Sequence, residues 1–364
     1  MRKPIKKVLM LLHYEMDHTS YMLYDGLYKV LGTDNLDIFP YINHFMGQGR
    51  VDEGYILDDG KRGWTVAPSH ISTHETPEKS FEEIAENIKS GYYDIIAFSN
   101  RTYAVRALDR FIAHLGRDKL PPLVIFEGED YSDLNTIRRL KQKYYPVASF
   151  KREYIPSEIS RTGGDLHPLF PLPFSAITDT FAEDKQIENK DIDVFALFGN
   201  TQQIRENIVK QIGSSDLPKK YKIHVGIDRF SNEPEKVTWS DQTRFQIPPL
   251  MSYKEYHEHM SRAKINIVAR GWGNDSIRRF EASSYGGLVL ADRLPIITPD
   301  DFIDGQHIIY YNSDLSDLIQ KIEYYLNNPV ERERIGKAGR DHCMKYHTTE
   351  SRARYFLERV EGLF

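Results

Sequence analysis

Residues with chemical potential are concentrated between Lys264 and Asp292, in the sequence KINIVARGWGNDSIRRFEASSYGGLVLAD. The apolar run KINIVA has the length of a buried strand, and the glycine-bearing loop Arg270–Gly273 follows it at once. Asn274 or Asp275 can cap the next helix, because a short polar side chain accepts hydrogen bonds from a first helical turn. Gly286–Gly287 then ends that helix, since glycine adopts the left-handed backbone that helix ends often require.

This strand, loop and helix together predict a site for a phosphorylated ligand. Ligands of open α/β sheets bind at the carboxyl ends of strands, and a helix N-terminus presents backbone N–H groups and the positive end of a dipole. Arg270 adds a cation whose planar fork matches phosphate oxygens. Glu281 lies further along the helix and is placed to accept hydrogen bonds from two adjacent ribose hydroxyls. As alternatives, Arg270 forms a surface ion pair and Glu281 pairs with Arg278 on the helix surface.

The elements around this segment alternate between strand and helix. The apolar runs predict strands at 8–12, 36–41, 94–98, 123–126, 147–150, 194–198, 222–225, 264–269 and 288–291. Helical spacing occurs at 21–31, 81–89, 104–115, 133–143, 202–212, 252–261 and 276–285, and across most of 315–364. Such alternation predicts parallel strands in doubly wound sheets.

A change of composition divides the chain into two such series. The proline-rich segment 168–173 precedes a polar, charged stretch at 178–191. Because few contacts cross such stretches, they are typical of domain boundaries. We therefore expect an α/β protein with two doubly wound Rossmann-like domains facing a cleft, at residues 1–177 and 192–350, joined by a linker at 178–191.

Composition excludes several classes of function. The 364 residues are 40% hydrophobic and 28% charged, which is typical of a globular protein, and the net charge of −5 shows no polybasic signature of nucleic-acid binding. Cys343 is the single cysteine, so neither an internal disulfide nor a four-cysteine zinc site can form. No apolar run approaches the roughly 20 residues that span a bilayer. We expect a cytoplasmic protein, with any membrane contact peripheral to the inner face.

Two motifs resemble metal sites, but we expect no metal there. His70 and His74 have the spacing of two ligands on one helix face, yet Pro68 and the residues between them disfavour a helix. The pair Asp191 and Asp193 forms a D-x-D sequence, but it precedes a strand rather than following one.

The same C-terminal segments resemble a known family. The run Ser276–Gly287, followed by Leu288–Asp292, resembles the sugar-nucleotide motif of group 1 (GT-B) glycosyltransferases, in the branch S-x-R-x-F-E-A-x-A-x-G-G. The Arg270–Gly273 loop is similar to that of exostosin-type transferases. Phe302–Tyr310 resembles the family segment F-x-D-G-x-E, and Asn327–Gly339 resembles P-E-x-R-x-x-I-x-x-A-G.

The resemblance extends from Phe195 to the C-terminus and implies roles for particular residues. It implies that Glu281 holds the ribose hydroxyls, and that the last helix, 351–364, packs back toward the N-terminal domain. It places Arg270, Gly271, Gly273 and Ser276 against the donor diphosphate, with Arg205 as a second phosphate candidate. Arg278 or Arg279 matches the family arginine before F-E, and the cleft is faced by Gly199, Asn200 and Thr201.

One position departs from the family pattern. Many retaining members carry a first glutamate eight positions before the ribose-binding one, and this chain has Gly273 there. Retaining and inverting chemistry both stay open. An inverting enzyme needs a base to deprotonate the acceptor hydroxyl.

Candidates for that base follow two strands of the N-terminal half. Asp17 and His18 are candidates after the first strand, with a solvated loop or helix cap as the alternative. Glu127–Asp130, with Glu129 and Asp130 as further candidates, follows another strand and is otherwise a solvated acidic loop. Lys151 and Arg152 meet the donor phosphates or lie on the surface.

The expected function is therefore glycosyl transfer. The donor is a nucleoside diphosphate sugar, with a UDP-sugar favoured, and the acceptor is a hydroxyl of a glycan, protein, lipid or nucleic-acid base. Transfer is expected to be metal-independent and to need no cofactor besides the donor, because arginines and helix dipoles can neutralise the leaving diphosphate. The alternatives are a nucleotide-sugar epimerase of the same fold and a non-catalytic protein that binds sugar nucleotides.

Overall fold

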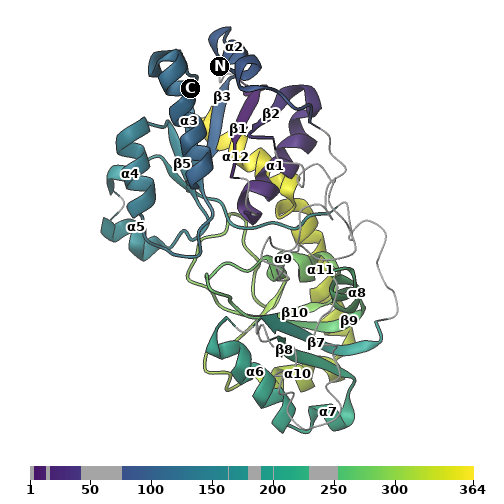
Figure 1. The fold of residues 1–364 in the computed structure, drawn as a ribbon. Helices are drawn as coiled ribbons and strands as arrows, with labels where there is room; N and C mark the ends of the chain where they lie inside the picture. Colours follow the sequence, from purple (N-terminus) through teal and green to yellow (C-terminus); the bar gives the residue numbers. More distant parts are fainter. Residues whose placement is uncertain are drawn as a thin grey trace.

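A computed structural model describes residues 4–13, 17–41, 76–162, 164–178, 190–199, 201–228 and 253–364. Within these residues the chain forms two α/β domains, each built on one parallel sheet (Figure 1). The first sheet has six strands in the order β2-β1-β3-β4-β5-β6, and the second has five in the order β11-β10-β9-β7-β8. Two doubly wound sheets confirm the predicted fold class.

The N-terminal domain alternates strands with helices. Its strands are β1 (Val8–Leu11), β2 (Leu36–Phe39), β3 (Ile95–Ser99), β4 (Leu123–Glu127), β5 (Ala148–Lys151) and β6 (Leu169–Pro171). Its helices are α1 (His18–Leu31), α2 (Phe81–Lys89), α3 (Thr102–Leu115), α4 (Asn135–Tyr144) and α5 (Pro156–Thr162). β6 was not expected: part of the proline-rich segment pairs with β5 as the edge strand, where proline is tolerated.

The C-terminal domain repeats the pattern. Its strands are β7 (Ile192–Gly199), β8 (Ile223–Asp228), β9 (Ala263–Val268), β10 (Leu288–Asp292) and β11 (Ile309–Tyr311). Its helices are α6 (Gln203–Ser214), α7 (Leu217–Lys220), α8 (Tyr253–Arg262), α9 (Ile277–Ser284), α10 (Leu318–Asn327) and α11 (Pro329–Tyr346), followed by α12 (Thr349–Glu361). None of the helices in the described part of the chain is long and apolar enough to cross a membrane.

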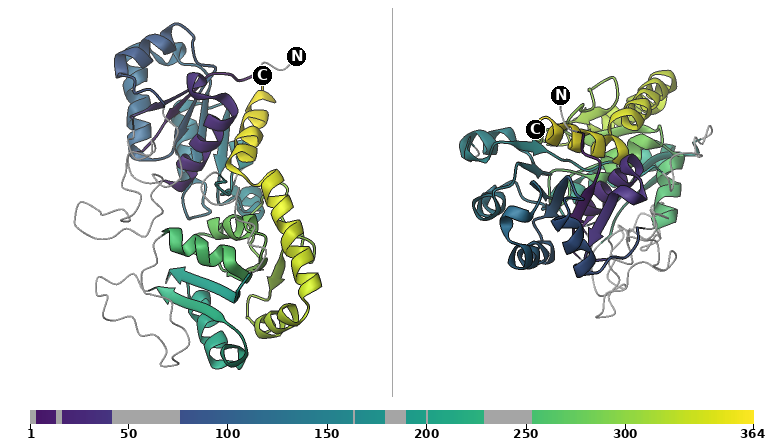
Figure 2. Two further views of the ribbon diagram at one scale, coloured as in Figure 1. Left: turned by 90° about the vertical axis from the view of Figure 1, so that its right-hand side faces the viewer. Right: turned by 90° about the horizontal axis from the view of Figure 1, so that it is seen from above.

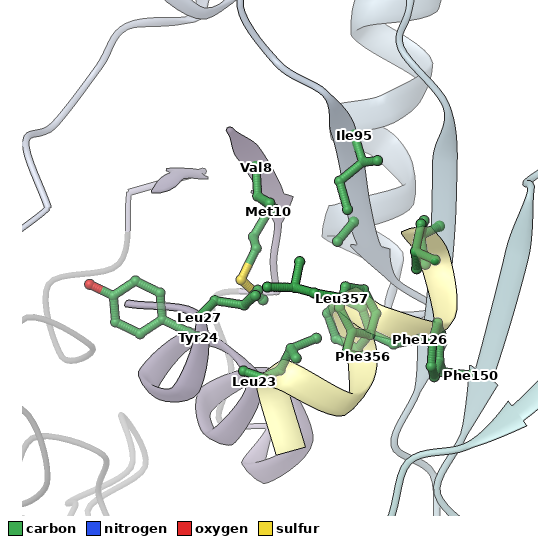
Figure 3. Packing of buried hydrophobic residues seen from close by; sticks show 14 of the residues in the cluster. Val8, Met10, Leu23, Tyr24, Leu27, Ile95, Phe126, Phe150, Phe356 and Leu357 are labelled. Carbon is green, nitrogen blue, oxygen red and sulfur yellow. The ribbon is translucent and has the colours of Figure 1, made fainter. Parts of the chain in front are cut away.

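Both faces of each sheet are buried, which explains the nearly continuous apolar strands. In β1, Val8 and Met10 pack into one cluster, while Leu9 and Leu11 pack into another on the opposite face. Figure 3 shows the first cluster, in which Val8 and Met10 lie among side chains of α1 and α12. Packing of helices on both faces therefore holds each strand in place, and with it the loop that follows the strand.

The last helix leaves the C-terminal domain and packs on the first one, beside α1 (Figures 1 and 2). Phe356 and Leu357 belong to the apolar cluster of the N-terminal domain. Asp25 of α1 is buried and accepts a hydrogen bond of 2.5 Å from the Thr349 hydroxyl. The N-terminal core thus depends on residues more than 300 positions later in the chain.

Gly26→Ala tests this helix contact. A Cβ atom at residue 26 would overlap the Thr349 carbonyl and lie 2.9 Å from the Cβ of Ala353. Alanine gains about 1 kcal/mol of helix propensity over glycine, but overpacking costs about 1–3 kcal/mol. We expect the free energy of unfolding in urea to fall by about 1 kcal/mol or more. In the control Gly164→Ala, the new Cβ meets no heavy atom of the described residues within 4 Å; an equal loss there would contradict the prediction.

Candidate functional site

The loop between β9 and α9 lies where the two domains meet. Ser276 is the N-cap of α9, so the expectation that Asn274 or Asp275 caps this helix is wrong. Asp275 instead accepts a hydrogen bond of 2.6 Å from the backbone N–H of Phe174, in the segment that leaves the N-terminal domain. Burial raises the pKa of Asp275 above its ordinary value. Gly286 has the expected left-handed backbone, with φ of 70°.

Glu281 lies in the second turn of α9 and is 6% exposed. Its Oε1 atom is 3.6 Å from Nε2 of His257 on α8. The other ring nitrogen of His257, Nδ1, is 2.8 Å from the hydroxyl of Tyr285. The alternative of a surface glutamate therefore does not hold. His257 was missed from the sequence, because nothing in the local pattern of 252–261 distinguishes a histidine that faces α9.

The two arginines before Phe280 have different surroundings. Arg279 is fully buried, donates a hydrogen bond of 2.8 Å to Thr298 and pairs with Asp301 at 3.1 Å, so it holds the loop beyond β10. Arg278 is half-buried and donates from Nε to the hydroxyl of Tyr256, at 2.7 Å. Of the two, Arg278 therefore keeps its guanidinium beside α8.

Arg205 and Arg270 lie at the carboxyl end of the second sheet. Arg205 is buried and donates to three backbone carbonyls, those of Arg270 at 2.7 Å and of Gly199 and Ala269 at 3.0 Å. Burial lowers the pKa of Arg205 to about 10. Arg270 pairs with Asp292 at 2.8 Å and is partly exposed. Arg205 therefore ties the ends of β7 and β9 together, while Arg270 keeps a guanidinium at the surface of the site.

The glycines here allow close approach. A Cβ on Gly271 would lie 3.1 Å from Nη2 of Arg205 and 3.7 Å from the Thr201 hydroxyl. Thr201 follows β7, so the loop after β9 passes directly over the start of the β7–α6 connection. Asn200, also expected here, lies outside the described residues.

Asp17 and His18 begin α1. Asp17 is the N-cap: its carboxylate accepts a hydrogen bond from the Thr19 backbone N–H at 3.0 Å and one from the Ser20 hydroxyl at 2.6 Å. Burial lowers the pKa of His18 below its ordinary value; Asp17 and then Glu281 oppose that shift. Because Glu281 belongs to the other domain, its influence on this pKa indicates that both side chains lie near the domain boundary. A neutral imidazole can accept a proton.

The acidic loop after β4 carries ion pairs. Glu129 pairs with Arg101 at 3.0 Å, and half-exposed Asp130 pairs with Arg152. Arg152 itself is 1% exposed and donates from Nε to the Gly128 carbonyl at 2.9 Å. Arg152 therefore lies inside the boundary between domains rather than on the surface.

Glu127 and Lys151 form a buried pair within the N-terminal domain. Their side chains are 2.5 Å apart, and Lys151 also donates to the carbonyl of Tyr131 at 2.9 Å. Burial raises the pKa of Glu127 to about 7, against the opposing influence of Lys151. Neither the solvated-loop alternative for Glu127 nor the surface alternative for Lys151 describes these side chains, because both are buried.

The two metal-like motifs give no metal centre among the described residues, which contain no group of three or more suitable ligands. Asp191 binds Arg262 and Lys222 at 2.6 Å, and those hydrogen bonds hold its pKa below the ordinary range. His70 and His74 lie outside the described residues.

Comparisons with known proteins identify the fold. Residues 203–358 match the family model described as glycosyl transferase-like. No curated protein sequence matches the chain. HepE from Anabaena in complex with UDP-glucose has a similar structure, with a TM-score of 0.55, 10% identity, and coverage of 98% of this chain and 100% of HepE.

Two further solved structures share the fold. Sucrose-phosphate synthase from Thermosynechococcus elongatus has a TM-score of 0.56 at 12% identity, covering 99% of both chains. A protein assigned as a UDP-N-acetylglucosamine 2-epimerase, from Listeria monocytogenes, has a TM-score of 0.50 at 10% identity, covering 99% of this chain and 96% of that one. The chain thus has the GT-B fold with a glycosyl transferase-like C-terminal domain, and the resemblance found in the sequence is confirmed.

The contact between the two domains predicts how His18 titrates. Since Glu281 raises the pKa of His18, Glu281→Gln should lower that pKa further, and the imidazole should stay neutral to lower pH than in the wild type. NMR of selectively labelled histidine, with the His18 signal assigned by His18→Gln, measures this. Glu255→Gln, at an exposed position on α8, should leave the His18 pKa unchanged. A rise on Glu281→Gln would contradict the arrangement.

Proposed function

We propose that this protein transfers a glycosyl group from a UDP-sugar to a hydroxyl acceptor without a divalent metal ion. The observation that carries the proposal is the burial of Glu281 on the helix that follows the glycine loop, together with its electrostatic influence on His18 of the other domain. The acceptor hydroxyl belongs to a glycan, protein, lipid or nucleic-acid base. HepE, which has the same fold, was solved with UDP-glucose bound, and UDP-glucose is therefore the donor to test first.

In this proposal the C-terminal domain binds the donor. Glu281 accepts hydrogen bonds from the two ribose hydroxyls, as buried acids do in dinucleotide-binding folds. Arg270, Arg278 and the N-terminus of α9 face the diphosphate, and fixed positive groups of this kind stabilise the charge that develops on a leaving group. A metal ion is then not required for that purpose.

The N-terminal domain supplies the base. Of the four candidates, Asp17 accepts two hydrogen bonds as a helix cap, and Glu129 and Asp130 form ion pairs with arginines. His18 combines a lowered pKa with an electrostatic influence from Glu281 of the other domain. A group that is neutral at physiological pH and can take a proton is suited to general-base catalysis, so we assign the role to His18.

Glu281→Gln is the first test of the proposal. Hydrogen bonds to a charged group contribute about 1.5–3 kcal/mol, so the Kd for UDP should rise by roughly 10–100-fold. Isothermal titration calorimetry measures the Kd, and thermal unfolding confirms that the variant folds. Glu255→Gln is the matched control. Equal UDP affinity in the wild type and Glu281→Gln would refute the role of Glu281, whereas UDP binding without consumption of any UDP-sugar would indicate a non-catalytic binding protein.

His18→Asn tests the base. Loss of a general base typically lowers the rate by about 10²–10⁴-fold, and we expect that fall in kcat for UDP release from UDP-glucose, with water as the acceptor when none is supplied. The Kd for UDP should change by less than about twofold, because His18 belongs to the acceptor side. Unchanged kcat would transfer the role of base to Glu129 or Asp130.

A further inference from the structure

Glu153 follows β5 and reaches from the N-terminal domain to the loop that precedes α9. Its side chain is 0% exposed. Oε2 accepts hydrogen bonds from the backbone N–H of Asn274 at 2.9 Å and from that residue's side-chain amide at 3.0 Å. Oε1 accepts from the backbone N–H of Asp275 at 2.8 Å. One carboxylate of the first domain thus binds two consecutive amides of the second.

Gly273 leaves the space that this carboxylate needs. A Cβ at residue 273 would lie 2.6 Å from Oε1 of Glu153, 3.0 Å from Oδ1 of Asp130 and 3.2 Å from Nη2 of Arg152. The first of these distances is shorter than a real contact, and no left-handed backbone is involved. Glycine at position 273 therefore leaves room for a carboxylate from the facing domain.

A second contact runs in the opposite direction across the boundary. Asp275 of the C-terminal domain accepts the backbone N–H of Phe174 at 2.6 Å. Arg152 stabilises the charge of Glu153, with its Nη1 atom 3.4 Å from Oε1. Each domain thus supplies a buried carboxylate to backbone amides of the other.

We propose that Glu153 is a positioning residue that makes the shape of the 270–275 loop depend on contact between the domains. When the domains separate, the carboxylate returns to water and both loop amides lose their acceptor. Because the closed and the separated domains differ in these hydrogen bonds, closing of the domains and ordering of the loop are coupled in a single equilibrium. The link to catalysis rests on the proposed function, in which this loop faces the donor diphosphate; the contact itself does not.

Hydrogen exchange tests the contact without any ligand. Glu153→Gln keeps the shape of the side chain but replaces one acceptor oxygen with an amide nitrogen. Hydrogen exchange of the Asn274 and Asp275 backbone amides should therefore be roughly tenfold faster or more. Glu158→Gln, on α5, is the matched control and should leave both rates unchanged. Wild-type exchange rates in Glu153→Gln would overturn the proposal.

Kinetics separate positioning from a general loss of structure. With UDP-glucose, Glu153→Gln should lower kcat by roughly tenfold or more, and by clearly more than it raises the Kd for UDP, since the proposed contact of Glu281 with the ribose does not depend on the loop. Equal losses of kcat and UDP affinity, accompanied by a lower Tm, would instead show a structural defect and overturn the proposal. If the wild type neither binds UDP nor consumes UDP-glucose, the proposed function fails, and amide exchange still decides whether the contact exists.

A second variant covers the case in which Glu153→Gln folds poorly. Gly273→Ala should also speed exchange of the two amides, because its Cβ displaces the carboxylate. Glu153→Ala removes the crowding carboxylate. In that background, Gly273→Ala should speed amide exchange by a factor roughly tenfold smaller than it does in the wild type. Strict additivity of the two substitutions would show that residues 153 and 273 act independently and would contradict the inference.

Discussion

The constraint on which the rest of this structure depends is that charged groups removed from water at the domain boundary must find partners. Glu153, Asp275, Glu281 and Arg152 are all buried there. A buried carboxylate without hydrogen bonds is unfavourable by several kcal/mol, roughly the order of a domain's whole stability. The partners are therefore not optional, and most of them lie in the other domain or on a neighbouring helix. These polar contacts hold the domains together in addition to the apolar packing of α12 on the N-terminal domain.

Polar contacts of this kind are reversible only if the domains stay near one another when the contacts break. Two segments provide that proximity. The backbone of Ala176 pairs with the segment around Thr348: its N–H donates to the His347 carbonyl at 2.7 Å, and its carbonyl accepts from the Thr349 N–H at 3.0 Å. The second segment is α12, which packs its apolar face into the N-terminal core (Figure 2). A tethered contact re-forms as an intramolecular event, at high effective concentration. An apolar crossover combined with a polar boundary is therefore suited to opening and closing without unfolding.

Much of the fold could be predicted from the sequence, and part of the site could not. Strand and helix positions follow from local periodicity. The glycine-bounded helix also predicts that Glu281 is not a surface residue, and its side chain is buried. The residues that sequence reasoning missed are joined by long-range contacts: Glu153 meets the loop 121 positions later, and no local pattern encodes that partner. Asp275 fits the helix-cap pattern equally well, but the adjoining domain supplies a backbone N–H to it. Arg205 has the positive charge expected of a residue that binds phosphate, yet its guanidinium donates hydrogen bonds to nearby carbonyls at the strand ends.

The division of roles between the domains gives the buried contacts a chemical consequence. In the proposed function, the proton acceptor lies at the start of α1 and the ribose-binding acid on α9, so neither domain alone contains a complete site. Reaction then requires the arrangement in which Glu281 influences His18, and this is the arrangement that Glu153 and Asp275 stabilise. In the proposed function, closure of the boundary excludes water, which protects a reactive donor from hydrolysis and strengthens the electrostatic interactions around it. Because the carboxylate of Glu153 lies on the domain opposite the loop, the proposal makes the order of the 270–275 loop depend on contact with the domain that carries His18.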